Sequence, residues 1–355
     1  MGEGGVWIGD KVAPGTGGEV TLRVSTSYAG AQIEIPVFIW RGAADGPRVF
    51  VTAAVHGDEI NGTGAIREII TTNPFSLARG TLVLVPVVNI LGFEQHARYL
   101  PDRRDLNRSF PGMKDGSQAS RMARAVFDAI VTPCDYGIDL HTAAIRRTNF
   151  PNVRADMSDA RVAALARAFG TELIVSGTGP KGSLRRAACK IGKPTIILEA
   201  GEVWKVEPAY MEYTVRGVRN CLAHLGMIEG EVRRPAYQIE ADTTKWVRAE
   251  RGGFLQFHVA PGDIVDEGEA IATSTSLTGE RQNVIESPRD GIVLGMTTLP
   301  SVAPGDAVCH LAYPKARALK KAEKVIDALP EDHLHERTRE DLSRSFVVGE
   351  RDEAD

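Results

Sequence analysis

The sequence lacks several features that would assign it to a broad class of protein. It has no run of about 18 apolar residues, the length that a membrane-spanning helix needs, so no membrane span is expected. Its net charge of -4 argues against nucleic-acid binding, because a phosphate backbone requires a clustered positive surface. The N-terminal residues Met1–Gly5 lack the basic and apolar regions of a signal peptide.

Cysteine is also scarce. The four cysteines are scattered, show no paired metal-ligand spacing and lie in apolar contexts (Cys134, Cys189, Cys221 and Cys309). We interpret them as reduced thiols of the core. Together with the missing signal peptide, this predicts a cytoplasmic protein.

The first two-thirds of the chain predict an α/β fold. Residues 1–45 predict a β-rich lead-in, because segments 19–24 and 32–40 alternate apolar and polar residues as half-buried strands do. Residues 46–230 alternate apolar, strand-like runs with amphipathic helices. This order predicts a mainly parallel mixed sheet with helices on both faces.

The pattern changes after Glu231. Short strands are separated by Gly and Pro, and segments 260–265 and 303–308 repeat a Pro-Gly-Asp turn that leads into a strand. Residues 231–315 therefore predict a small all-β barrel or sandwich domain. Residues 316–355 are highly charged and predict one amphipathic helix in a partly disordered tail.

Four polar side chains stand directly after strand-like apolar runs: His56, Glu59, His141 and Glu199. In an open parallel sheet, ligands bind outside the carboxyl ends of the strands, so we expect these side chains to converge. Two imidazoles and one carboxylate form the ligand set of a catalytic zinc ion. We predict that His56, Glu59 and His141 bind one zinc ion per chain.

Each of these residues also has a purely structural interpretation. His56 would be a hydrogen-bonded core imidazole, and Glu59 an acid at a helix N-terminus. Glu199 ends a run that should be buried. It would act as a general base beside the metal, or else form an ion pair with Arg185 or Arg186.

Two further features accompany these residues. Asp139 lies two residues before His141 on the same strand face, and would either orient that imidazole or make a structural hydrogen bond. The basic, turn-rich segment 103–112 offers guanidinium groups that can grip a carboxylate, and Asn107 can donate to the same oxygens. The alternative is a solvated loop with charge pairs.

Four motifs in sequence order resemble the succinylglutamate desuccinylase/aspartoacylase family, a branch of the zinc carboxypeptidase fold. They are His56-Gly57-Asp58-Glu59, Asp105-Leu106-Asn107-Arg108-x-Phe110-Pro111-Gly112, Asp139-Leu140-His141-Thr142 and Glu199-x-Gly201. The resemblance spans residues 45–225 or so. It implies a zinc-dependent hydrolase domain over residues 46–230, and the appended β domain matches the family's plan.

The resemblance implies roles for the residues of these motifs. The three predicted ligands would bind zinc, and Glu199 would activate the water and return the proton to the leaving amine. Asn107 and Arg108 would bind a substrate carboxylate. Arg98 is our choice for the arginine that polarises the scissile carbonyl. Arg103 is a further candidate for substrate binding, and Arg103 or Arg104 could replace Arg98.

These roles predict a zinc-dependent amidohydrolase, in which zinc-bound water attacks the amide of an N-acyl amino acid and removes an acetyl- or succinyl-type group. The expected partner is a small acidic N-acyl amino acid, with a homo-oligomer left open. A metallocarboxypeptidase acting on a peptide or poly-glutamate C-terminus would use the same zinc site. A non-catalytic binding protein on the same scaffold is the third alternative, against which the intact ligand set and Glu199 argue.

Overall fold

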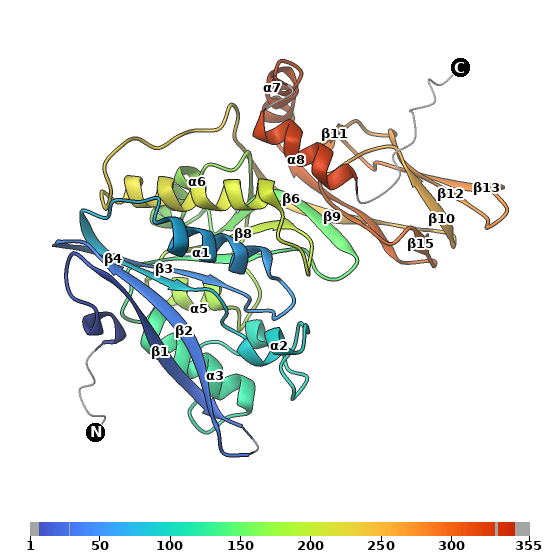
Figure 1. Cartoon of the computed structure of the whole chain (residues 1–355). Coiled ribbons are helices and arrows are strands. Elements are labelled where there is room, and N and C mark those ends of the chain that lie inside the picture. The colour runs from blue at the N-terminus through green and yellow to red at the C-terminus, as the bar shows by residue number, and fades with distance from the viewer. Residues whose placement is uncertain (1–6, 28, 331–332, 345–355) are drawn as a thin grey trace.

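A large mixed sheet organises the molecule, as a computed structural model of residues 7–27, 29–330 and 333–344 describes it (Figure 1). The strands of its first part are β1 (Gly17–Thr26), β2 (Gln32–Arg41), β3 (Ala44–Ala53), β4 (Arg79–Val85), β5 (Tyr136–His141), β6 (Arg147–Ala155), β7 (Leu173–Ser176) and β8 (Thr195–Gly201). They lie in the order β1-β2-β4-β3-β5-β8-β6-β7. The expected α/β fold with a mixed sheet is confirmed.

Parallel pairing is confined to parts of this sheet. Strands β4, β3, β5 and β8 run parallel to one another, and β6 runs parallel to β7. The β1–β2, β2–β4 and β8–β6 pairs are antiparallel. The mainly parallel description therefore applies to the centre alone. The β1–β2 hairpin of the expected lead-in continues the sheet through β4 rather than standing apart.

Helices cover both faces of the sheet because its central strands are apolar on both sides (Figure 1). Val49 and Val51 pack in one core cluster with residues of α1, α4 and α6, whereas Phe50 between them packs in a second cluster with residues of α3 and α5. The helices are α1 (Asn61–Thr72), α2 (Ile90–Glu94), α3 (Gln118–Val126), α4 (Ala160–Phe169), α5 (Leu184–Lys190) and α6 (Pro208–His224).

The C-terminal strands form a barrel together with strands of the first part. They are β9 (Ile239–Arg248), β10 (Gly253–Phe257), β11 (Ile264–Val265), β12 (Ala270–Thr275), β13 (Arg281–Glu286), β14 (Gly291–Thr297), β15 (Ser301–Val302) and β16 (Ala307–Pro314). The ring β6-β7-β9-β16-β14 closes through pairing of β14 with β6. A barrel or sandwich was expected from residues 231–315 alone, but the barrel that forms also includes β6 and β7. A separate four-stranded sheet has the order β13-β12-β10-β15.

The C-terminal segment holds two helices where one was expected: α7 (Ala316–Ile326) and α8 (Leu334–Ser343). Leu319 of α7 is buried in the core beside β9, and Leu334 of α8 packs with residues of α6. Residues 331–332 and 345–355 of the expected tail lie outside the described residues. No helix of the described part is long and apolar enough to cross a membrane.

The close approach of β14 to β6, which closes the barrel, can be tested at Gly295. This residue pairs with Asn149 of β6. A Cβ at this position would stand 2.6 Å from the Thr148 carbonyl oxygen. We expect Gly295→Ala to lower the free energy of unfolding in urea by about 1–3 kcal/mol, the usual cost of overpacking. Gly18→Ala is the control, because its nearest neighbour is a Val12 methyl at 3.5 Å. Equal losses in both variants would contradict the close approach.

Candidate active site

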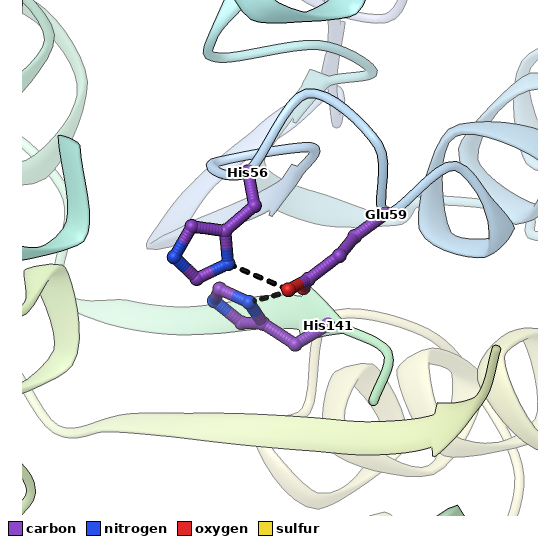
Figure 2. A group of neighbouring side chains, drawn as sticks. All are labelled: His56, Glu59 and His141. Atoms are coloured by element: carbon purple, nitrogen blue, oxygen red, sulfur yellow. Dashed lines mark hydrogen bonds and ion pairs between the residues drawn. The ribbon is translucent and has the colours of Figure 1, made fainter. Parts of the chain in front are cut away.

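The three predicted metal ligands meet at the ends of β3 and β5 (Figure 2). His56 and Glu59 lie in the turn between β3 and α1, and His141 is the last residue of β5. One Glu59 oxygen lies 2.7 Å from His56 Nδ1, and the other lies 2.7 Å from His141 Nδ1. The ligand atoms of the three buried side chains all lie within 4.8 Å of one another.

The turn that carries His56 and Glu59 is shaped by two backbone features. Ala54, directly after β3, has a φ of 49°, a strained left-handed conformation of the kind that clusters at functional sites. A Cβ at Gly57 would overlap the backbone of Gly92 and Phe93 in α2, so the turn can approach that helix only with glycine. The turn therefore holds its two polar side chains over the strand ends.

Charge is balanced inside this cluster. Burial opposes ionisation of Glu59, but the two imidazoles outweigh it and hold the pKa of that carboxyl well below its usual range. Burial also opposes a charge on His141, but Asp139 and Glu59 raise the pKa of that imidazole well above its usual value. A buried carboxylate with two imidazoles turned towards it is a donor set that fits a divalent cation such as zinc.

Two aspartates contact the outer nitrogens of the imidazoles. Asp139 Oδ2 lies 2.9 Å from His141 Nε2, and Thr52 on the neighbouring strand donates to its other oxygen at 2.7 Å. Asp105 Oδ1 lies 3.2 Å from His56 Nε2. Such contacts fix the ring orientation and leave Nδ1 for a metal. Asp139 therefore contacts the His141 ring, as one of its two interpretations expects. Asp105 belongs to one of the four motifs, but no role was assigned to it from the sequence.

Glu199 lies beside His141 because the two residues pair in register between β5 and β8. Asn149 Nδ2 donates to one carboxylate oxygen at 3.2 Å. Arg154 Nε lies 3.7 Å from the other oxygen. The ion-pair partner is therefore Arg154, not Arg185 or Arg186 as the structural alternative proposed.

A cavity of about 400 Å³ joins these groups. His56, Glu59, His141 and Glu199 line it, and so do five arginines: Arg98, Arg108, Arg147, Arg154 and Arg185. Arg98 is fixed beside the ligand cluster, because its Nη1 donates to Glu59 at 2.7 Å.

The loop with Asn107 and Arg108 reaches the cavity, but Arg103 does not. The buried Asn107 accepts a hydrogen bond from the Leu184 N–H at 2.9 Å, which attaches the loop to α5. Arg108 is exposed and lines the cavity. Arg103 is exposed, with a φ of 61°, in a turn that its N–H closes on Leu100, and it is not among the lining residues. Arg103 is therefore not part of the cavity wall, and its role in substrate binding stays a prediction.

Several lining residues were not found from the sequence. Arg147 and Arg154 lie on β6, and Trp246 and His310 come from barrel strands β9 and β16. The Trp246 and His310 rings stack at 4.6 Å, and the Arg147 guanidinium lies 4.5 Å from the Trp246 ring centre. Burial, with the nearby Arg154 and Arg147, lowers the pKa of His310 to about 3, so this imidazole is neutral.

Comparison with known proteins places these residues in a family. A model of the succinylglutamate desuccinylase/aspartoacylase catalytic domain matches residues 45–225, just over half of the chain. N-alpha-acetyl-L-2,4-diaminobutyric acid deacetylase of Halomonas elongata is 28% identical over 294 residues, which cover 79% of this chain and 86% of that protein.

Two solved structures share the fold over most of the chain. The product-bound ectoine utilization protein EutE (DoeB) of Ruegeria pomeroyi has a TM-score of 0.72 at 25% identity, covering 84% of this chain and 94% of that one. A succinylglutamate desuccinylase/aspartoacylase of Rhodobacter sphaeroides has a TM-score of 0.72 at 26% identity, covering 84% and 95%. The chain belongs to the succinylglutamate desuccinylase/aspartoacylase family.

Proposed function

We propose that this protein is a zinc-dependent amidohydrolase that removes an acetyl- or succinyl-type group from an N-acyl amino acid. The observation that carries the proposal is the meeting of His56, Glu59 and His141 with Glu199 in one arginine-lined cavity. The Halomonas relative, named as a deacetylase of an N-acetylated amino acid, supports this reaction class. We also infer the layout of the zinc carboxypeptidase fold.

One zinc ion per chain would be held by His56, Glu59 and His141. When bound, zinc supplies a Lewis acid that polarises an amide oxygen and lowers the pKa of water towards neutrality. Asp105 and Asp139 contact the Nε2 atoms of the two imidazoles, so the Nδ1 atom of each ring points towards Glu59.

Glu199 is the proposed proton carrier. It takes a proton as the water oxygen bonds to the acyl carbon, and returns it to the nitrogen as the carbon–nitrogen bond breaks. Asn149 and Arg154 hold its two oxygens, and its pairing with His141 sets it beside the ligand cluster. The products are a carboxylic acid and a free amine.

Arginines would handle the negative charges of the substrate. Arg98, which contacts Glu59, would stabilise the oxyanion that develops at the scissile carbonyl. Arg108 would bind a substrate carboxylate, and the amide nitrogen of Asn107 would donate to the same group.

We place the protein in the cytoplasm on the basis of its four free cysteines, which fit a reducing compartment.

A substrate panel tests the proposed function. Zinc-loaded protein would be incubated with N-acetyl- and N-succinyl-amino acids and with short peptides, and products identified by mass spectrometry. We expect the N-acyl compounds to release free amino acids. The peptides should remain uncleaved. Trimming of peptide C-termini would support the metallocarboxypeptidase, and zinc binding without hydrolysis of any compound would support the binding protein.

Glu199→Gln removes the proton acceptor and keeps the shape of the side chain. We expect kcat to fall about 10²–10⁴-fold, the usual contribution of a general base, while one zinc remains bound per chain. Steady-state kinetics with elemental analysis would measure both. Glu202→Gln is the control, because Glu202 lies three residues on and does not line the cavity. Near wild-type turnover in Glu199→Gln would remove the residue from its role.

Arg108→Ala removes the proposed carboxylate contact. We expect KM for an N-acyl amino acid to rise about 10- to 100-fold, the range of a charge-assisted hydrogen bond, with a smaller change in kcat. Initial-rate measurements over a range of substrate concentrations would separate the two constants. Arg121→Ala is the control, because Arg121 is exposed and does not line the cavity. An unchanged KM in Arg108→Ala would contradict the assignment.

A further inference from the structure

Strand β1 leaves one edge of the large sheet open. It is the outermost strand of that sheet, and β2 is its only strand neighbour among the described residues (Figure 1). An open edge presents backbone N–H and C=O groups without partners, and natural proteins usually cover or interrupt it. Strand β1 has ten residues, whereas β11 at the other end of the sheet has two. The proposed reaction does not explain this long edge, because no described residue before His56 lines the cavity.

The pairing with β2 determines which backbone groups of β1 face outwards. The Arg41 N–H donates to the Thr16 carbonyl oxygen at 3.0 Å, so Thr16 directs its backbone towards β2. In an antiparallel pair, every second residue directs both its N–H and its C=O to the same side. Pro36 agrees with this assignment, because it has no N–H and lies opposite Thr21. The central residues of β1 whose backbone faces away from β2 are Glu19, Thr21 and Arg23.

These three residues are complementary to a second copy of the same strand. When two β1 strands pair antiparallel with Thr21 opposite Thr21, Glu19 of each copy lies opposite Arg23 of the other. The outward N–H and C=O groups of all three residues then find partners across the edge. Each carboxylate also faces a guanidinium, which is a stabilising cross-strand pair. All three side chains are exposed, so both copies can approach.

The apolar side chains of β1 fit the same pairing. Val20 and Leu22 lie on the other face of the sheet, where they pack against the core cluster that includes α3 but stay half-buried. In the pairing centred on Thr21, Val20 lies opposite Leu22 of the second copy at a non-hydrogen-bonded position, where side chains approach most closely. The second copy therefore covers apolar surface that one chain leaves exposed. An edge protected against pairing typically carries repelling charges such as lysines instead.

We propose that this protein forms a homodimer in which β1 pairs antiparallel with β1 of a second copy, about a two-fold axis at Thr21. The contact is isologous, because the same residues meet from both copies. It joins the two large sheets into one. A bulge between Arg23 and Ser25 limits the regular pairing to a short stretch. A small interface of this kind gives a reversible dimer that depends on protein concentration.

Charge exchange at the two facing positions tests this pairing by sedimentation velocity. We expect wild-type protein to show a dimer whose fraction rises with protein concentration. Glu19→Arg places arginine opposite arginine, and Arg23→Glu places glutamate opposite glutamate. Each single variant should lower the association constant about 10-fold or more, because two attractive pairs become repulsive. An equimolar mixture of the two variants should recover the dimer, since the arginines of one chain then face the glutamates of the other.

The mixture also separates lost pairing from lost folding. Arg23 lies opposite Glu34 of β2 in its own chain, so Arg23→Glu could weaken the fold, but a misfolded chain would not recover the dimer. Glu229→Arg and Arg234→Glu are the matched controls, because both residues are exposed in the loop between α6 and β9. Both controls should associate as the wild type does. A wild type that stays monomeric, or a mixture that stays monomeric, would overturn the proposal.

Hydrogen exchange locates the interface on the chain. In concentrated wild-type protein, the amides of Glu19, Thr21 and Arg23 should exchange more slowly than in dilute protein. The amides of Val20 and Leu22 face β2 in both states and should change less. Glu19→Arg alone should lose the extra protection. A dimer that forms without extra protection in β1 would place the interface elsewhere and contradict the proposal.

Discussion

The rest of the site depends on the contacts that the buried carboxylate of Glu59 makes with its neighbours. One oxygen lies against His56 and Arg98, and the other lies against His141 and accepts from the Thr142 N–H at 3.1 Å. A single anion thus connects the turn after β3, the end of β5 and the loop that carries Arg98. In a buried network of this kind each contact depends on the others, because an unpaired charge would be costly.

Sheet geometry sets the remaining groups around that anion. Parallel pairing of β5 with β8 brings Glu199 beside His141, and β6 lies next to β8 and supplies Asn149 and Arg154. Because β6 also closes the barrel, the barrel strands place Trp246 and His310 in the cavity wall. The C-terminal half therefore helps to shape the same cavity that holds the candidate ligands.

The parts of the site at strand ends could be predicted, because a buried strand has a local signature and polar residues directly after it stand out. His56, His141 and Glu199 were found in this way. Arg154 was not, because Pro151 and the polar residues around it hide strand β6. Arg103 was also predicted but does not line the cavity, because the path of an irregular loop depends on contacts that the local sequence does not encode. Barrel closure by β6 is likewise a long-range pairing without a local signal.

The central claim is that His56, Glu59 and His141 bind one zinc ion. Anomalous diffraction from zinc-loaded crystals, recorded on both sides of the zinc absorption edge, tests it most directly. We predict one strong peak per chain at about 2.0–2.1 Å from a ring nitrogen of each histidine, with a Glu59 oxygen as the third protein ligand. A peak elsewhere, or none at saturating zinc, would contradict the account.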